Sequence, residues 1–153
     1  MRTGSVKPFI IIEPEGLAPI KDTGEWEEVE MGVDSGATET VIREQILSWI
    51  KTQEGLAFKR GVEYEVANGV RIPNLGEKEF RGMTEEGAVK TVTAQVCDVS
   101  QNLLSVRKVV EAGNRVVFDS EGSYIESKRD GSLTWLADKQ GMYTMKLWAK
   151  KGF

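Results

Sequence analysis

The sequence contains no histidine, and this absence removes several kinds of active site. Ser-His-Asp and Cys-His hydrolases use an imidazole as general base, so neither is available in its common form. Zinc sites built from cysteine and histidine are excluded too, because one cysteine cannot supply a tetrahedral ligand set. Acid–base chemistry near neutral pH must therefore come from carboxylates, lysine or tyrosine.

Other features are scarce as well. Cys97 is the only cysteine, so the chain cannot form an internal disulfide, which agrees with a reducing compartment. No apolar run approaches the length of a membrane span, and no signal-like apolar segment follows Met1, so we expect either an intracellular, cytoplasmic protein or a piece excised from a longer chain. The formal net charge of −4 provides no basic surface, and we expect neither nucleic acid nor membrane as a partner.

The 153 residues are enough for one domain, and their pattern predicts a mainly β fold with one or two short helices. We expect a flexible N-terminal segment over 1–7, a folded domain over 8–148 and a solvated C-terminal tail over 149–153. Strands are expected over 8–13, 26–33, 63–67, 70–72, 77–83, 88–98, 115–118, 124–125 and 142–148, and a turn at 130–131 precedes 133–136. Cys97 falls inside one of them and is expected to be a buried, inert thiol.

Two segments have helical signals. Ile42, Ile46, Trp49 and Ile50 recur at helical spacing, which predicts a short amphipathic helix over 43–51 with its apolar stripe in the core. Ser105 can cap the start of a second helix and Gly113 can end it. Between the two, Asn68-Gly69 is typical of a two-residue turn, so residues 63–72 are expected to form a β-hairpin.

The segment with the clearest chemical potential is Asp34-Ser35-Gly36, which directly follows the expected strand over 26–33. All three residues favour turns, so an ordinary turn is one interpretation. The Asp-Ser-Gly signature of serine proteases is a second, and it fails for lack of a histidine and because Ala37 follows. In the third, the loop belongs to an aspartic protease: the carboxylate activates water, the hydroxyl fixes the carboxylate, and the glycine admits the substrate backbone.

The segment Asp34-Ser-Gly-Ala-Thr-Glu-Thr-Val-Ile42 resembles the active-site segment of retropepsins, the aspartic proteases of retroviruses and LTR retrotransposons. Asn102-Leu-Leu-Ser-Val, then a short helix, Gly113 and Val116-Val-Phe-Asp119, resemble the second half of copia-type retrotransposon proteases. Ser105 stands where the family normally has glycine, as copia-type sequences allow. The similarity continues through Gly141-Met-Tyr143 and spans most of the chain from Phe9 to Leu147.

The resemblance implies a retropepsin-like closed β-barrel that forms a homodimer and binds a peptide or polyprotein substrate. One chain carries one Asp-Ser-Gly, so the family's mechanism requires Asp34 from each of two subunits, sharing a proton across a two-fold axis. Ser35 would orient the carboxylate and Gly36 would contact the substrate backbone; neither a metal nor an organic cofactor is implied. The strands over 9–12 and 143–147 are candidates for the dimer sheet.

Substrate contacts are expected from two places. Ala37 and Thr38 follow the catalytic loop, and Thr38 stands where retroviral members carry an acidic residue that binds the substrate backbone. The hairpin with Asn68 and Gly69 at its tip is the expected flap, and 74–76 is a second candidate for it. The candidate pocket walls are Val41, Val66 and Val70.

Two alternatives to an active endopeptidase remain open on the sequence. The first is a retropepsin-like module that dimerises or binds peptides without cleaving them. The second is a monomeric β-rich adaptor in which Asp34 is a turn residue. For an active enzyme the resemblance implies polyprotein processing in the cytoplasm or within virus-like particles.

Overall fold

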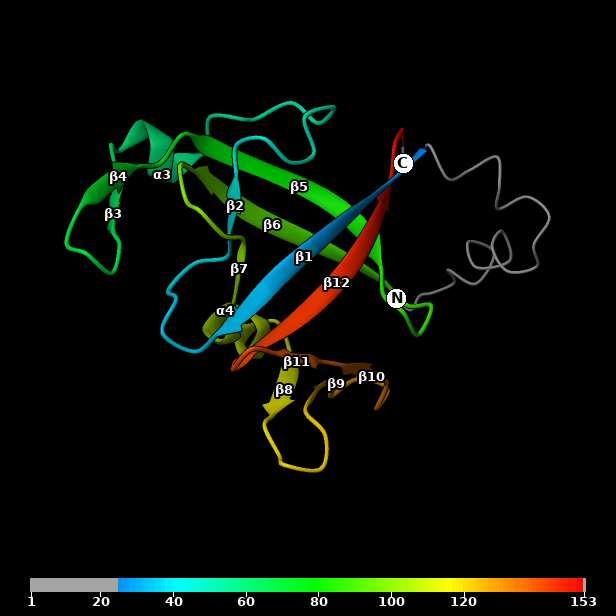
Figure 1. Ribbon diagram of the computed structural model, residues 1–153. Coiled ribbons are helices and arrows are strands. Elements are labelled where there is room, and N and C mark those ends of the chain that lie inside the picture. The colour runs from blue at the N-terminus through cyan, green and yellow to red at the C-terminus, as the bar shows by residue number, and fades with distance from the viewer. Residues whose placement is uncertain (1–24, 153) are drawn as a thin grey trace.

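The computed structural model describes residues 25–152, and the expected mainly β architecture is confirmed for them (Figure 1). The expected strand over 8–13 and the segment over 1–7 lie outside the described residues. The strands are β1 (Trp26–Asp34), β2 (Val41–Arg43), β3 (Glu63–Glu65), β4 (Arg71–Pro73), β5 (Gly76–Met83), β6 (Val89–Cys97), β7 (Leu103–Ser105), β8 (Asn114–Val117), β9 (Tyr124–Ser127), β10 (Leu133–Trp135), β11 (Ala137–Lys139) and β12 (Met142–Lys150). The helices within 25–152 are α3 (Leu56–Lys59) and α4 (Val106–Glu111).

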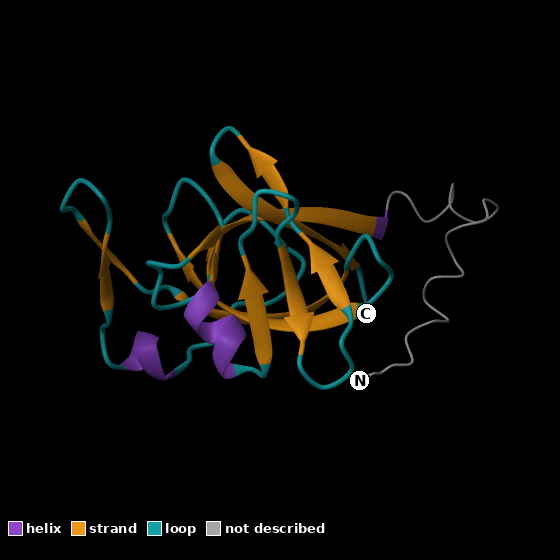
Figure 2. Cartoon of the chain, turned by 90° about the horizontal axis from the view of Figure 1, so that it is seen from below, coloured by secondary structure: helices purple, strands orange, loops and turns teal. Residues whose placement is uncertain are grey.

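The largest sheet closes on itself. Its strand order is β1-β7-β2-β6-β5-β12-β11, and β1 also pairs with β12, so the first six of these strands form a ring. β1 is parallel to β7 on one side and antiparallel to β12 on the other, from Trp26↔Lys150 to Gly32↔Thr144. The turned view shows the strands curving around the ring (Figure 2). β1 is therefore held along both of its edges.

The interior of the ring is the hydrophobic core. Alternation along β1 sends Val29, Met31 and Val33 inward, where each is at most 8% exposed. Ile42 and Leu147 are completely buried in the same cluster. Removing each such side chain from water contributes about 1.5–3 kcal/mol. The side chains of Glu30 and Asp34 lie on the opposite face of β1 and point away from the core.

The amphipathic helix expected over 43–51 is wrong, because the segment forms a series of turns. Leu47 adopts a positive φ of 53°, which a regular helix does not allow. The carboxylate of Glu27 accepts hydrogen bonds from Leu47 N (2.9 Å) and Trp49 Nε1 (3.0 Å). The ammonium of Lys78 donates to the carbonyl oxygens of Ile46 (3.2 Å) and Leu47 (2.8 Å). Side chains from two other strands thus replace hydrogen bonds of a helix, while the apolar stripe still packs against the core.

The second helix and its boundaries are confirmed. α4 is capped by Ser105, whose side chain accepts a hydrogen bond from Lys108 N, and it is followed by Gly113 at a φ of 95°. Strands β8, β9 and β10 form a separate antiparallel sheet after this helix.

The hairpin over 63–73 is also confirmed, with a different turn. Val66 N donates to Val70 O (2.9 Å), so the loop holds three residues, 67–69, where two were expected. Gly69 N donates to Val66 O (2.8 Å) and Gly69 has a φ of 85°, an arrangement typical of a turn followed by a glycine bulge. Both views show the β3–β4 hairpin projecting at one side of the molecule (Figures 1 and 2).

The C-terminal end differs from expectation in two ways. β12 continues to Lys150 and Ala149 is completely buried, so the tail does not begin at residue 149. The stretch 143–147, expected in a dimer sheet, lies within β12 and pairs with β1 of its own chain. β11 occupies part of the other edge of β12 through Ala137↔Thr144 and Asp138↔Tyr143. That stretch is therefore already paired within one chain.

Candidate functional site

Asp34 ends β1 and begins an exposed loop. Its carboxylate accepts a hydrogen bond from the backbone N–H of Gly36 (Oδ1, 2.7 Å), which orients the carboxyl group. Among residues 25–152 the hydroxyl of Ser35, expected to do this, forms no hydrogen bond. Ser35 and Gly36 are exposed and Asp34 is half-buried, so the loop presents one accessible carboxylate. The three residues expected to be catalytic therefore lie together, with the glycine backbone in the orienting role.

The loop is anchored by Ser105 at the end of β7, which pairs with Asp34 across the parallel β1–β7 ladder. The Ser105 hydroxyl donates to Ala37 O (2.7 Å), and Ser105 N donates to Thr40 Oγ1 (3.0 Å). Ser105 is completely buried and Thr40 is 4% exposed, so water does not compete for these bonds. The two segments that carried the family resemblance, some 70 residues apart, are thus joined at the candidate site.

Asn102 joins the same strands from the other end of β7. Its side-chain oxygen accepts from Arg43 N (2.8 Å), and its side-chain nitrogen donates to Glu30 O (3.1 Å). Its backbone oxygen accepts from Gly32 N (2.9 Å). One amide therefore connects β1 to β2 next to the Asp34 loop. Sequence reasoning placed Asn102 in a motif without assigning it this role, and Thr40 likewise.

The expected substrate-contacting residues fall into two groups. Ala37 is half-buried and Thr38 exposed in the Asp34 loop, whereas Val66, Asn68, Gly69 and Val70 lie at the hairpin tip. Val70 is 52% exposed, and Asn68 Oδ1 accepts from Val70 N (3.0 Å). In the described part of the chain no hydrogen bond or ion pair joins the hairpin tip to the Asp34 loop.

Val41 belongs to neither group. It is 7% exposed, yet it is absent from the main core cluster that contains its neighbour Ile42. Because successive residues of a strand point to opposite faces, Val41 faces away from the interior of the ring. It is covered within the single chain.

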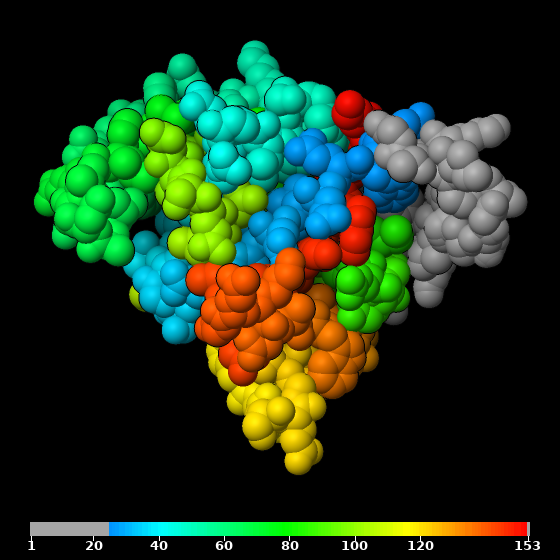
Figure 3. Space-filling model, viewed as in Figure 1, coloured from blue at the N-terminus to red at the C-terminus, as the bar shows by residue number. Residues whose placement is uncertain are grey.

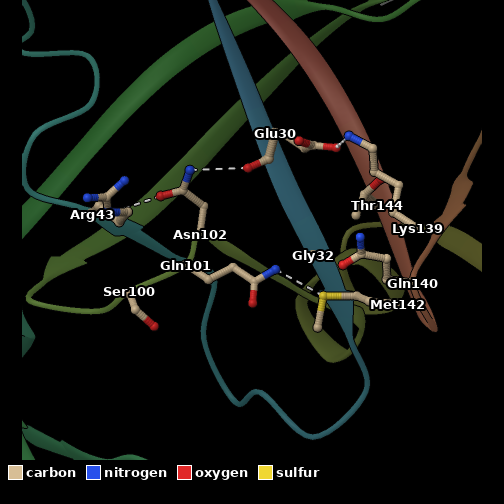
Figure 4. A pocket seen from close by; sticks show the side chains of 10 residues that line it. All are labelled: Glu30, Gly32, Arg43, Ser100, Gln101, Asn102, Lys139, Gln140, Met142 and Thr144. Carbon is tan, nitrogen blue, oxygen red and sulfur yellow. Dashed lines mark hydrogen bonds and ion pairs between the residues drawn. The ribbon is translucent and has the colours of Figure 1, made fainter.

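A cavity of about 430 Å³ lies on the outward face of β1, next to the Asp34 loop (Figure 4). Gly32 lines it, and Gln101 and Met142 meet over this glycine with Nε2 and Sδ 3.0 Å apart. A Cβ at Gly32 would lie 2.6 Å from Met142 Sδ, so only glycine allows this contact without a shift. In the space-filling view β1 (blue), the segment before β7 (yellow-green) and the β11 region (orange) meet on this face (Figure 3).

One end of the cavity holds an ion pair. Lys139 Nζ lies 2.8 Å from Glu30 Oε2, and this hydrogen bond lowers the pKa of the Glu30 carboxyl group and raises the pKa of Lys139. The opposite end is lined by Arg43, Ser100 and Asn102 (Figure 4). The cavity thus combines a neutralised pair with one further cation.

The cysteine and the remaining carboxylates do not form a second candidate site among the described residues. Cys97 is completely buried as expected, and burial raises the pKa of its thiol to about 11, so it is not a nucleophile near neutral pH. No cluster of carboxylates and cysteine among residues 25–152 could hold a metal ion. Asp34 remains the accessible, oriented acid at the point where the two motifs meet.

The described residues contain no helix long and apolar enough to cross a membrane. Comparison of the chain with protein-family models, with curated proteins and with solved structures finds no match.

Proposed function

We propose that this protein is a retropepsin-like aspartic endopeptidase that acts as a homodimer and processes a polyprotein. The observation that carries the proposal is the joining of the two motif segments. Asp34 ends β1, its carboxylate is oriented by Gly36 N–H, and its loop is fixed by the buried Ser105 on the parallel neighbour β7. The buried Ser105 hydroxyl, contributed from a distant segment, holds the backbone of the loop in one conformation, which supports a preorganised site.

The chemistry follows from the carboxylate and its surroundings. One chain presents one Asp34, and no other side-chain carboxyl group within 25–152 hydrogen-bonds to it. A second subunit would bring its own Asp34 close, and two adjacent carboxylates share one proton because both cannot ionise at low cost. The ionised member takes a proton from the attacking water, and the protonated member donates to the oxygen of the scissile carbonyl.

The rest of the loop fits an extended peptide substrate. Gly36 has no side chain and is exposed, so a substrate backbone can approach the carboxylate. The β3–β4 hairpin offers exposed Val70 as an apolar contact, and residues 74–75 join it to β5 of the ring. Peptides bound in extended form place alternate side chains on opposite faces, so one peptide can contact both the loop and the hairpin.

The test is hydrolysis of a mixed peptide library by the purified full chain at mildly acidic pH, read by mass spectrometry. We expect cleavage by the wild type and none by Asp34→Asn. Asp119→Asn is the matched control, because Asp119 lies in an exposed turn and should leave cleavage unchanged. Cleavage that persists in Asp34→Asn would refute the assignment.

A mixing experiment tests the dimer. At fixed total concentration, an equal mixture of wild-type and Asp34→Asn chains leaves about one quarter of the dimers with two Asp34 carboxylates, since subunits pair at random. Activity should therefore fall to about one quarter. A fall to only one half would show that each chain works alone.

A second candidate is a retropepsin-like peptide-binding or dimerisation module without catalysis. The observation that favours it is the free Ser35 hydroxyl, which among residues 25–152 does not support the Asp34 carboxylate. Binding of library peptides without cleavage by a demonstrated dimer would support this module and refute the peptidase.

A further inference from the structure

Arg43 lines the cavity beside the Asp34 loop, and its side chain lacks an acceptor. Its Nε is buried and has no hydrogen-bond partner among residues 25–152, and no carboxylate there forms an ion pair with it. Its backbone N–H, in contrast, is bound by Asn102 Oδ1. Arginine remains charged at every physiological pH, and a buried donor without an acceptor costs free energy. The cation at this end of the cavity is therefore available for an anionic ligand.

The other charges lining the cavity do not satisfy Arg43. Glu30 is paired with Lys139 at 2.8 Å, and Figure 4 places this pair apart from Arg43. The two charges cancel, so Arg43 gives the lining a formal excess of one positive charge. The hydroxyl of Ser100 and the amide of Gln101 line the same space and add hydrogen-bonding capacity.

The cavity also lies close to the candidate catalytic carboxylate. Gly32 lines it and points to the same face of β1 as Asp34, two residues later. Same-face residues of a strand are separated by about 7 Å, which is the spacing between alternate side chains of an extended peptide. An extended peptide that passes Asp34 and continues along β1 would therefore bring a side chain over the cavity a few residues farther on.

We propose that this cavity is a specificity pocket for a carboxylate, supplied by an acidic side chain of an extended peptide ligand. The proposal rests on the proposed function for the identity of the ligand as a peptide. The planar guanidinium of Arg43 matches the two oxygens of a carboxylate. With Glu30 neutralised by Lys139, the lining carries a formal excess of only one positive charge, which matches a singly charged carboxylate better than a doubly charged phosphate.

The test measures binding in the full chain carrying Asp34→Asn, so that no probe is cleaved. The probes are the blocked peptide acetyl-Ala-Val-Glu-Val-Ala-amide and the same peptide with Gln in place of Glu. NMR titration follows the Nε–H signal of Arg43 and the side-chain amide of Asn102. We expect the Glu peptide to shift both signals and to bind at least about tenfold more tightly, the ratio expected for one charge-assisted hydrogen bond.

Two variants test whether the preference for the Glu peptide depends on Arg43. Arg43→Gln should abolish the preference for Glu, and Arg43→Lys should retain part of it because the charge remains. Arg115→Gln is the matched control, since Arg115 pairs with Glu126 on the separate β8–β9 sheet and should leave the preference intact.

Equal affinity for the Glu and Gln peptides, or a preference that survives Arg43→Gln, would overturn the pocket. Cleavage by the wild type without any preference for acidic residues would overturn it while the proposed peptidase stands. Arg43-dependent binding without cleavage would leave the pocket standing and the peptidase refuted.

Discussion

Replacing Ser105 with alanine tests whether its buried hydroxyl holds the Asp34 loop. The hydroxyl accepts from Lys108 N (3.2 Å) as the cap of α4 and donates to Ala37 O (2.7 Å). Loss of a helix cap costs about 1 kcal/mol. Leaving the Ala37 carbonyl without its donor costs about 1 kcal/mol more. We therefore expect Ser105→Ala to lower the free energy of unfolding by about 2 kcal/mol.

Thermal and urea unfolding followed by circular dichroism measure this loss. For a chain of this size about 2 kcal/mol corresponds to a fall in Tm of roughly 4–8 °C. Ser48→Ala is the matched control, because Ser48 is exposed and its side chain makes no hydrogen bond within residues 25–152. Its stability should remain within about 0.5 kcal/mol of the wild type.

Hydrogen exchange separates an effect on the loop from a general loss of stability. Without the anchor, the amides of Gly36 and Ala37 should exchange about fivefold faster than the global change explains, since about 1 kcal/mol acts on the loop itself. A Ser105→Ala protein with unchanged Tm would refute the account of the hydroxyl. Unchanged local exchange in a destabilised protein would refute the anchoring of the loop.

Three further predictions concern side chains around the ring. Asn102→Ala should lower the free energy of unfolding in urea by about 2–4 kcal/mol, because it leaves the Arg43 N–H and the Glu30 carbonyl unpaired. Asn68→Ala, at the exposed hairpin tip, should lower it by less than about 1 kcal/mol. Equal losses in the two variants would contradict the bridging role of Asn102. Lys78→Met should cost about 1–3 kcal/mol by removing the ammonium from two backbone carbonyls. Burial lowers the pKa of Lys78 in the folded protein below its ordinary 10.5. Between the folded-state pKa and 10.5 the unfolded chain binds more protons than the folded one, so the free energy of unfolding should rise with pH there. This rise should be smaller in Lys78→Met. Lys139→Met should raise the pKa of Glu30 toward 4.5 in a carbon-detected NMR titration, because it removes the hydrogen bond that lowers this pKa. In the wild type, the stabilisation that the Glu30–Lys139 pair provides should be lost as the pH falls through the folded-state pKa of Glu30.

Local sequence signals predicted the elements whose hydrogen bonds are local. Alternating apolar residues identified β1, β5, β6 and β12, and a serine cap with a terminal glycine identified α4. The Asp-Ser-Gly tripeptide correctly indicated an exposed loop at the end of a strand. In each of these cases the residues that determine the structure are neighbours in the sequence.

The segment over 43–51 shows where this reasoning fails. Its apolar spacing suits a helix, but Glu27 and Lys78 supply bonds from other strands to the backbone of the turns around Leu47. Such bonds depend on strand register, which one sequence does not reveal. The amphipathic pattern therefore indicated which side chains face the core but not the backbone conformation that carries them.

Strand register also determines which residues meet at the candidate site, and one sequence does not reveal it. The resemblance to a known family drew attention to the segments that contain Asp34 and Ser105, but the pairing of these two residues comes from the structure. The bridge made by Asn102 and the free guanidinium of Arg43 depend on how β1, β7 and β2 lie side by side. No local pattern distinguishes these residues from any other asparagine or arginine on a strand.

The ring has a consequence for synthesis of the chain. β1 carries Asp34 and is made early, but its partners in β7 are made about 70 residues later and its partners in β12 about 110 to 125 residues later. A ribosome must therefore release the sequence through Lys150 before the edges of β1 are both paired, and contacts of such long sequence separation form slowly. Until then the nascent chain holds its acidic loop without a fixed geometry. The order of translation would thus delay the proposed peptidase activity until the sequence through Lys150 had emerged.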